Sequence, residues 1–225
     1  MNLSRLLLCG LALALSACSS TVFVNLPDGV VSKCDERFVG TWQVKSDGDT
    51  PPDQDEPDFL TIEPGCAKFI GTDVAAHEHE DVLDDTEIQF IDGKRHDYVV
   101  TRDRPSPDDA ESGDTVKDQA YTLHRIRMSR DQRIELLDVN HERISDLLRA
   151  GKLHGKSEIT APKKGNRTYE NLIESDSAEL TRALNDRKVF LREATIVLQR
   201  VDAEVLREAL SRPKVKTDDQ GQSGE

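Results

Sequence analysis

Alternating hydrophobic and polar positions run through the first half of the chain and predict β-strands. Residues 38–44, 59–62 and 67–70 show this pattern, and the dipeptide Pro64-Gly65 supplies a turn between the last two segments. Strands that are joined by tight turns pair antiparallel, so we expect these segments to open an antiparallel sheet.

Two longer segments have the pattern of β-hairpins. In residues 87–100, the dipeptide Asp92-Gly93 separates two alternating arms and suits a type I′ turn. A second hairpin is predicted to join residues 121–128 to residues 133–139. The first half of the chain therefore has the pattern of an antiparallel meander.

Helical spacing appears in the second half. Asn140 precedes apolar residues at i, i+3, i+4 spacing and is suited to cap a helix that ends at Gly151. Asp176 and Glu179 have capping-box spacing ahead of a second short helix. The remaining expected elements are a closing strand over residues 194–201 and a last helix over residues 202–210. The predicted fold class is α+β, an antiparallel sheet or lipocalin-like half-barrel with two or three short helices.

Two groups of residues carry a family resemblance. Gly40-Thr41-Trp42 on the first strand resembles the Gly-x-Trp opening of lipocalin-like barrels, in which Trp42 would be a core aromatic residue that closes one end. The order of elements from 38 to 201, with Gly151-Lys152-Leu153-His154-Gly155 after a short helix, is similar to that of uncharacterised proteobacterial lipoproteins. This resemblance implies a layout and no assigned activity.

The N-terminus has the three parts of an export signal. Residues 1–5 carry one positive charge, residues 6–15 are apolar, and Leu15-Ser16-Ala17-Cys18 follows. Ten apolar residues are too few to span a bilayer. The segment resembles a bacterial lipoprotein signal peptide with a complete lipobox.

The lipobox resemblance implies that Cys18 is the lipid attachment site. The chain would be cut before Cys18, its thiol would carry diacylglycerol, and several acyl chains would hold it firmly in a membrane. Ser19 at the next position implies an outer-membrane destination, and we expect the periplasmic side. The alternative interpretation is an ordinary secretory signal in which Cys18 is a chance residue.

Two cysteines remain after the signal and the lipid site are assigned. Cys34 and Cys66 would lie in an oxidising compartment, so we expect them to form a disulfide. A closed loop of this length stabilises the fold by about 3–4 kcal/mol in the chain-entropy model. The alternative is a pair of free buried thiols.

The expected organisation has four parts. They are a signal peptide over 1–17, a lipidated N-terminus and linker over 18–33, one α+β domain over 34–210, and a disordered tail over 211–225.

Charge excludes one class of partner. The 225 residues hold 43 acidic side chains against 30 Lys and Arg, a formal net charge of −13. The acids concentrate before residue 125 in three polar stretches, over residues 46–58, 73–87 and 102–118. We expect no nucleic-acid partner, because its phosphates would be repelled.

Candidate metal sites fall in these acidic stretches. His77-Glu78-His79-Glu80 places two imidazoles on one face of an extended segment, a pattern compatible with zinc or copper. A calcium interpretation can be considered for five aspartates, but no EF-hand register fits them: Asp47, Asp49, Asp53, Asp55 and Asp58. We interpret both segments as solvated acidic loops, and we expect no metal and no cofactor.

Two functional hypotheses remain. The chain lacks Gly-x-Ser-x-Gly, His-Glu-x-x-His and P-loop motifs, so we expect no enzyme activity and no catalytic residue. The first hypothesis is a lipid-anchored, lipocalin-like module that binds a small apolar or amphipathic ligand. The alternative is an envelope structural or protein-interaction lipoprotein whose acidic surface meets a cationic protein partner.

Overall fold

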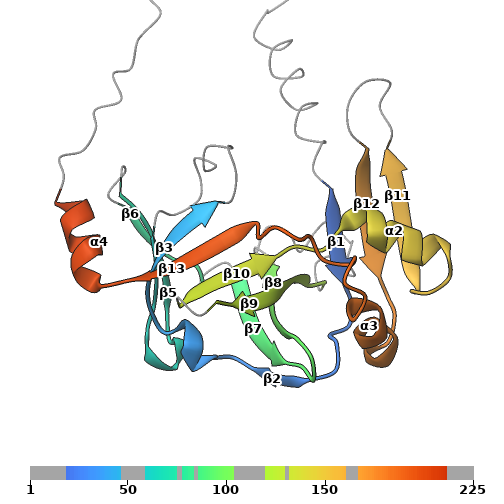
Figure 1. Ribbon diagram of the computed structural model, residues 1–225, viewed down its shortest axis with the longest axis horizontal. Coiled ribbons are helices and arrows are strands. Elements are labelled where there is room, and N and C mark those ends of the chain that lie inside the picture. Colours follow the sequence, from blue (N-terminus) through green and yellow to red (C-terminus); the bar gives the residue numbers. More distant parts are fainter. Residues whose placement is uncertain are drawn as a thin grey trace, which may run out of the picture. The chain divides into compact units, whose positions relative to one another are not determined.

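The computed structural model shows two compact units (Figure 1). It describes residues 19–46, 59–74, 78–83, 86–103, 120–129, 132–160 and 167–211. Unit 1 comprises the described residues of Met1–Ser32, Asp85–Arg127 and Leu136–Ala194. Unit 2 comprises those of Lys33–Asp84, Met128–Glu135 and Thr195–Glu225.

The predicted fold class is confirmed. Among the described residues, ten strands belong to a larger antiparallel sheet and three to a smaller sheet, and three α-helices accompany them. This is an α+β protein with a lipocalin-like layout. The larger sheet divides between the two units, and strand β10 (Arg133–Leu137) contains the boundary.

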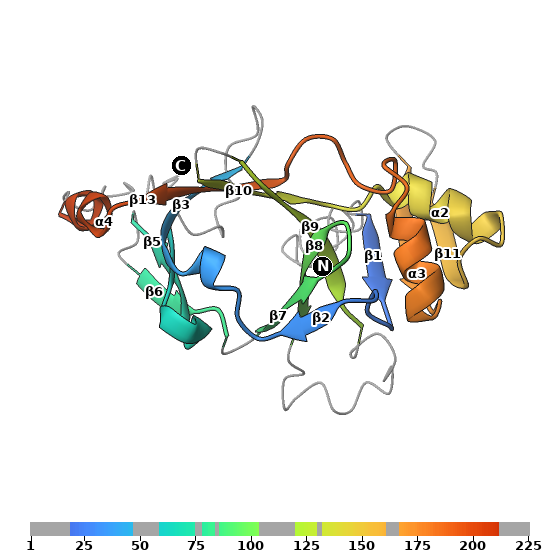
Figure 2. The ribbon, with the colours of Figure 1, turned by 60° about the horizontal axis from the view of Figure 1, so that its bottom comes forward.

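Unit 1 contains an antiparallel meander, a three-stranded sheet and two helices. In the meander, β2, β7, β8 and β9 are consecutive neighbours (Figure 2). In the smaller sheet, β12 lies between β11, which is antiparallel to it, and β1, which is parallel. The elements are β1 (Ser20–Phe23), β2 (Val30–Ser32), β7 (Thr86–Asp92), β8 (Asp97–Asp103), β9 (Thr122–Met128), α2 (His141–Arg149), β11 (Gly155–Thr160), β12 (Thr168–Ile173) and α3 (Ser177–Leu184).

Helix α2 lies on the three-stranded sheet and contacts all three of its strands, with α3 beside it (Figures 1 and 2). Both predicted N-caps are present. Asn140 Oδ1 accepts a hydrogen bond from the Arg143 amide at 3.0 Å, and Asp176 Oδ1 accepts one from the Glu179 amide at 2.8 Å. Gly151 ends α2 with φ +65°, a conformation that glycine adopts without strain.

The core of unit 1 lies between the meander, the helices and β1. Phe23 on β1 is fully buried, and a large side chain buried to this extent stabilises the fold by about 1.5–3 kcal/mol. The buried cluster comprises Phe23, Ile91, Tyr98, Val100, Leu123, Leu137, Val139, Ile144, Leu147, Leu153, Ile173, Leu180, Leu184, Val189 and Phe190.

Unit 2 is an antiparallel sheet with the strand order β13-β3-β4-β5-β6. Strand β3 pairs with β4 on one side and with β13 on the other, so the predicted closing strand does pair back to the first strand of the domain. The elements are η2 (Glu36–Phe38), β3 (Gly40–Ser46), β4 (Phe59–Ile62), η3 (Pro64–Cys66), β5 (Phe69–Asp73), β6 (Glu78–Asp81), β13 (Ile196–Val201) and α4 (Ala203–Leu210).

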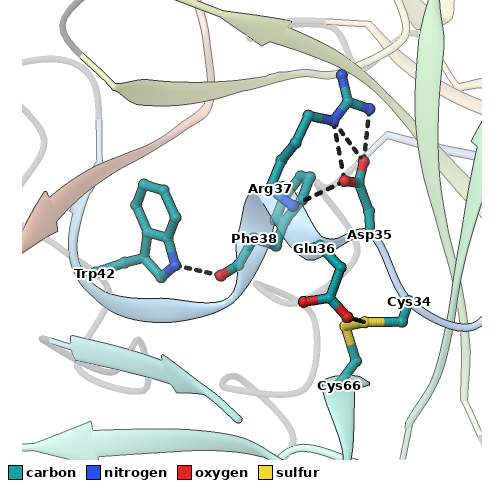
Figure 3. Close-up of a disulfide and its surroundings, with 7 residues drawn as sticks. All are labelled: Cys34, Asp35, Glu36, Arg37, Phe38, Trp42 and Cys66. Atoms are coloured by element: carbon teal, nitrogen blue, oxygen red, sulfur yellow. Dashed lines mark hydrogen bonds and ion pairs between the residues drawn. A yellow bond between two sulfur atoms is a disulfide. The ribbon is translucent and has the colours of Figure 1, made fainter. Parts of the chain in front are cut away.

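A disulfide ties together the two short 3-10 helices of unit 2 (Figure 3). Cys34 and Cys66 are joined with their Cα atoms 5.2 Å apart, which confirms the predicted pairing. Nearby, Trp42 is 1% exposed and its indole N–H donates to the Phe38 carbonyl at 2.6 Å. Trp42 is therefore a core aromatic residue, as expected.

The turn at Asp92-Gly93 differs from the prediction. Asp92 pairs with Asp97, so the loop of the β7–β8 hairpin has four residues, 93–96, and is not a two-residue type I′ turn. Gly93 is required for a different reason. A Cβ atom there would lie 2.5 Å from the His96 carbonyl oxygen.

Several strand boundaries also differ. The first strand of the domain begins at Gly40, since Phe38 belongs to η2. The strand after η3 covers Phe69–Asp73 and pairs with β4. The sequence indicates a polar loop where the structure has strand β6. This strand pairs with β5 at the edge of the sheet, where its charged side chains stay exposed, so it shows no hydrophobic alternation.

The segment 18–33 carries more structure than the expected linker. It contains β1 and β2, and Phe23 of β1 is at the centre of the unit 1 core. A strand of three or four residues is too short to be recognised from alternating hydrophobic and polar positions. Strand β1 therefore begins two residues after Cys18, the expected lipid site.

Some predictions lie outside the described residues. They concern Cys18 and the signal peptide, the acidic stretch 47–58, most of the stretch 102–118, and the tail from 212 onward. Within the described ranges, no helix has the length and apolar character that crossing a membrane requires.

Candidate functional site

Unit 1 contains a cleft with a volume of about 1400 Å³. Four parts of the unit line it: the β7–β8 turn, strand β9, helix α2 and the segment after α3. The lining residues are Arg95, His96, Arg125, Arg127, Asn140, Glu142, Arg143, Asp146, Asn185, Arg187, Lys188, Phe190, Leu191 and Arg192. Seven of these are Arg or Lys, and two are acidic. We call this feature the cationic cleft.

Arg125 is positioned in the cleft by an aromatic ring. It lies on β9 opposite Tyr98 of β8, and its guanidinium carbon is 4.9 Å from the centroid of the Phe190 ring. The Tyr98 and Phe190 rings stack with centroids 6.0 Å apart. This buried aromatic pair supports the half-buried guanidinium, which fixes its orientation before any ligand arrives.

The charge states around Arg125 follow from burial. Burial raises the pKa of Tyr98 to about 12, so the phenol is neutral and cannot offset the guanidinium. Burial also lowers the pKa of Arg125. Tyr98 opposes this effect only when its phenol is ionised, and the nearby charge of Arg127 adds to the lowering. Arg125 stays charged at neutral pH all the same, because arginine begins from a very high pKa.

His96 lies in the positive field of the same cations. It is on the β7–β8 turn next to Arg95. Its pKa is lowered first by burial and then by the charges of Arg125 and Arg95, against a smaller opposite effect of Asp97. The imidazole is therefore neutral at neutral pH and can donate one hydrogen bond into the cleft.

Backbone bonds hold the segment after α3 against the rest of unit 1. The Asn140 amide donates to the Val189 carbonyl at 2.7 Å, and Phe190 forms a bridge with Val139. The Arg127 guanidinium donates to the Arg192 carbonyl at 3.5 Å. The end of β9 and the residues that follow β10 thus fix the position of this segment, which carries Arg187, Lys188 and Arg192.

One cation of the cleft is paired. Arg143 of α2 donates to Asp186 Oδ2 at 2.6 Å, and the Lys188 amide donates to the other oxygen at 3.0 Å. The Lys188 amide bond lowers the pKa of Asp186 most, and the bond from Arg143 adds to this effect. This carboxylate is ionised at neutral pH and neutralises Arg143.

Other cations of the cleft have no such partner. Across the described ranges, no carboxylate forms an ion pair with Arg95, Arg125, Arg187 or Arg192. Clustered like charges repel one another, and part burial strengthens the repulsion. An anion in the cleft would relieve it.

A smaller hollow of about 260 Å³ lies where β1 meets β9 and the start of α2. His124 Nδ1 is 2.5 Å from Asp138 Oδ1 on its wall, and His141 Nδ1 is 2.8 Å from Thr21 Oγ1. Burial lowers the pKa of His141, which is therefore neutral at neutral pH.

A buried amide joins β12 to its neighbours beneath this hollow. Asn171 is 3% exposed, donates to Thr21 Oγ1 and to the His141 carbonyl, and accepts a hydrogen bond from Ser157 at 2.7 Å. These bonds connect β1, β11, β12 and α2. The network satisfies buried polar groups and holds the three-stranded sheet in register.

The residues singled out from the sequence meet different outcomes. Cys34 and Cys66 form the disulfide of unit 2, whereas Cys18 and His77 lie outside the described residues. His79 is on β6, and its Nδ1 is 2.9 Å from Thr72 Oγ1. Within the described residues, no group of three His, Cys, Asp or Glu side chains is placed to hold a metal ion.

The sequence interpretation missed the cationic cleft entirely. Its residues come from four separate segments, and the formal charge of −13 directs attention to the acids. A weak signal was present, because Arg125 and Arg127 share one face of a predicted strand and residues 125–225 hold most of the cations.

Comparisons with known proteins give no relative: no protein-family model, no curated protein and no solved structure matches the chain.

Proposed function

We propose that this protein is a lipid-anchored lipoprotein of the outer membrane, facing the periplasm, that binds an anionic ligand in the cationic cleft of unit 1. One observation carries the binding function. Arg95, Arg125, Arg187 and Arg192 line a single cleft without carboxylate partners in the described part of the chain.

The electrostatic repulsion among these clustered arginines supports a binding role. A purely structural surface would pair these guanidinium groups with some of the 43 acidic side chains of the protein. The pKa of Arg125 is lowered by burial and by Arg127, which means that the site disfavours its own charge. Sites that keep such groups charged and partly buried are commonly functional.

The net charge defines the ligand further. A protein of −13 repels long polyanions, whereas a cluster confined to one cleft attracts a small anion once solvent ions screen the distant acids over about 8 Å. The cationic lining argues against an apolar ligand in this cleft. A small, anionic ligand is therefore the proposal, with an apolar part contacting Phe190 at most.

The start of unit 1 supports the lipid anchor. Ser19 Oγ accepts a hydrogen bond from the Tyr169 amide at 3.0 Å, and β1 begins at the next residue. A lipid on Cys18 would therefore hold unit 1 close to the membrane surface. The alternative function, an acidic protein-interaction surface, depends on stretches that lie mostly outside the described residues, so the cleft supports ligand binding better.

The anchor is tested by a single substitution. We expect Cys18→Ala to abolish incorporation of labelled palmitate and to release the protein from the membrane fraction, because the thiol is the proposed acceptor. Cys34→Ser serves as a control for the loss of a cysteine elsewhere. Unchanged labelling and retention in Cys18→Ala would contradict the lipoprotein proposal.

The binding function is tested by calorimetry on the full chain in detergent micelles. We expect citrate, sulfate or inorganic phosphate to bind, and the double variant Arg125→Gln/Arg192→Gln to bind at least about tenfold more weakly, because two charged donors are lost. The control is Arg200→Gln in unit 2, which removes an arginine that also lies over an aromatic ring. Absence of binding, or equal losses in both variants, would contradict the proposal.

A further inference from the structure

Arginine dominates the cleft, and this determines which anions it suits. Six of its seven cations are arginines. A guanidinium presents several N–H donors in a fixed plane that matches the oxygens of phosphate or carboxylate. A single carboxylate has only two oxygens to share among these donors. A phosphoryl group has three, which it can offer to several guanidinium groups at once.

The strand side of the cleft is built to receive such a group. Arg125 is held over Phe190 and lies opposite Tyr98, which is two residues after His96, and Arg95, His96 and Arg125 all line the cleft. Two cations and one neutral imidazole donor thus converge on the same place. The lowered pKa of His96 agrees with this proximity, since each positive charge disfavours its protonation.

The helix side of the cleft has a different chemistry. Glu142 and Asp146 line it, and no cation of the described chain pairs with Glu142. A carboxylate repels a simple anion but accepts hydrogen bonds from hydroxyl groups. A ligand that uses both sides therefore carries hydroxyl groups as well as negative charge.

The size of the cleft fits a ligand of this kind. Its volume of about 1400 Å³ exceeds the 300–1000 Å³ that is typical for small-molecule pockets. Inorganic phosphate would leave most of the space to water. A phosphorylated sugar, free or as the headgroup of a lipid, adds a ring with hydroxyl groups for which the cleft has room.

We propose, on the basis of the proposed anion-binding function, that the cationic cleft binds a phosphorylated sugar, with the phosphoryl group held by Arg95, His96 and Arg125 and the hydroxyl groups facing Glu142. The chemistry that is recognised is the same for a soluble sugar phosphate and for a phosphorylated glycolipid headgroup.

The ligand class is tested by titrating the full chain in detergent micelles with four probes: glucose phosphate, glucuronate, inorganic phosphate and glucose. We expect glucose phosphate to bind at least about tenfold more tightly than glucuronate, which carries a carboxylate on the same ring. Glucose alone should not bind measurably. Equal affinities for glucose phosphate and glucuronate would overturn the inference while leaving the anion-binding function intact.

Substitutions test the two sides of the cleft separately. Arg125→Gln and Arg95→Gln should reduce the preference for glucose phosphate over glucuronate to about twofold or less, whereas Arg187→Gln should weaken both probes equally. Arg95 is on an exposed turn, so this variant remains informative if Arg125→Gln fails to fold. An unchanged preference in Arg95→Gln would overturn the assignment of the phosphoryl position.

Glu142→Gln gives effects of opposite sign. Removal of a negative charge should strengthen binding of inorganic phosphate, and loss of a strong hydroxyl acceptor should weaken binding of glucose phosphate. Stronger binding of both probes would overturn the role of Glu142.

The source of the ligand is settled with mixed micelles that contain phosphatidylinositol phosphate or, as the phosphate-free control, glucosyl diacylglycerol. Tighter binding of the phosphorylated lipid than of glucose phosphate assigns a lipid headgroup, and the reverse assigns a soluble sugar phosphate. Either result supports the inference if Arg125→Gln weakens binding of the preferred ligand about tenfold or more. Equal binding of both lipids and of glucose phosphate would overturn it.

Discussion

The two units use their charged and aromatic side chains in opposite ways. In unit 2, Arg37 pairs with Asp35 at 2.5 Å (Figure 3). Arg200 of the same unit lies over Trp42 and donates to the Val39 carbonyl at 2.9 Å. In unit 1, Arg125 also lies over an aromatic ring, but it lines a cleft and has no carboxylate partner within the described ranges.

This difference separates stability from binding. The guanidinium of Arg200 donates to backbone carbonyls of unit 2 and so stabilises the fold. The guanidinium of Arg125 lines a cleft, where its N–H groups can donate to a ligand. The disulfide belongs to unit 2 and the cationic cleft to unit 1. We therefore expect changes in unit 2 to alter stability alone, and changes in the cleft to alter binding.

Intrinsic spectroscopic signals can follow the unfolding of each unit separately. Trp42 is the one tryptophan in the sequence and lies in unit 2, and the three tyrosines, Tyr98, Tyr121 and Tyr169, all lie in unit 1. Tryptophan-selective excitation therefore reports unit 2, and the near-ultraviolet circular dichroism of tyrosine reports unit 1. Coincident transitions in every variant would show that the units unfold as one.

Loss of the disulfide should have the largest effect. Cys34 and Cys66 are 32 positions apart, and the chain-entropy model assigns a loop of this length about 3–4 kcal/mol. We expect the double variant Cys34→Ser/Cys66→Ser to lower the denaturation midpoint of the tryptophan signal strongly. The tyrosine midpoint and the affinity for anions should change little. An equal fall in both midpoints would contradict the division of roles.

Ligand binding should stabilise unit 1 selectively, whereas loss of the disulfide should destabilise unit 2. A ligand at a hundred times its dissociation constant stabilises the folded state by about 2.7 kcal/mol. In urea titrations, we expect a saturating anion to raise the free energy of unfolding from the tyrosine signal by about this amount, and to leave that from the tryptophan signal unchanged. The matched control is Arg125→Gln, for which the same anion concentration should have little effect. A shift confined to the tryptophan signal would place the site in unit 2.

The same comparison explains what the sequence predicts well. The disulfide, both helix caps and most strands of unit 2 depend on residues that are close in sequence, such as Asp176 and Glu179, or on pairing rules with few alternatives. The β7–β8 hairpin was located correctly, but its turn type was wrong because Asp92 continues the strand. Local chemistry identifies an element more reliably than its last residue.

The cleft and the three-stranded sheet depend on residues that are far apart. Strand β1 pairs with β12 in parallel across 150 positions, and the bond from Asn171 to Thr21 spans the same separation. No short pattern encodes such pairings. Arg95, Arg125 and Arg192 likewise meet only after folding, so a net charge of −13 concealed a local excess of cations.

The buried amide of unit 1 should be the next most sensitive position. Asn171→Ala removes partners from Thr21, Ser157 and the His141 carbonyl, and groups left buried without partners cost about 1–3 kcal/mol. We expect the tyrosine midpoint to fall and the tryptophan midpoint to stay within error. Glu170→Ala, an exposed neighbour on β12, is the control and should have little effect on either signal. A fall confined to the tryptophan signal would contradict this role.

Acid should affect the units in different pH ranges. The folded-state pKa of His141 is lowered by burial, so the unfolded chain binds its proton first and unit 1 loses stability as the pH falls below about 6.5, by at most about 1.4 kcal/mol per pH unit. For Asp35 in unit 2, burial raises the pKa, but the bonds from Arg37 outweigh this effect and lower it. Its contribution is therefore lost only below about pH 4.

The His141→Gln variant separates this effect from general acid denaturation. It should reduce the pH dependence of the tyrosine midpoint between about pH 6.5 and pH 5, because one of two histidines of unit 1 with a lowered pKa is gone and His96 remains. The tryptophan midpoint should show no such slope in either protein. An unchanged tyrosine slope in His141→Gln would assign the acid sensitivity to another group.

Removal of Arg200 should have the smallest effect and gives the closest match between the units. Its guanidinium carbon is 4.6 Å from the Trp42 ring centroid, much as Arg125 lies over Phe190, and exposed contacts of this kind contribute about 0.5–1 kcal/mol. Arg200→Met keeps part of the packing and removes the charge, so we expect a small fall in the tryptophan midpoint and unchanged anion affinity. Arg125→Met should reverse the pattern, with a large loss of affinity. If the two variants instead gave the same loss of affinity, stacked arginines in the two units would have to share one role, and the cleft would no longer be distinguished by its unpaired charge.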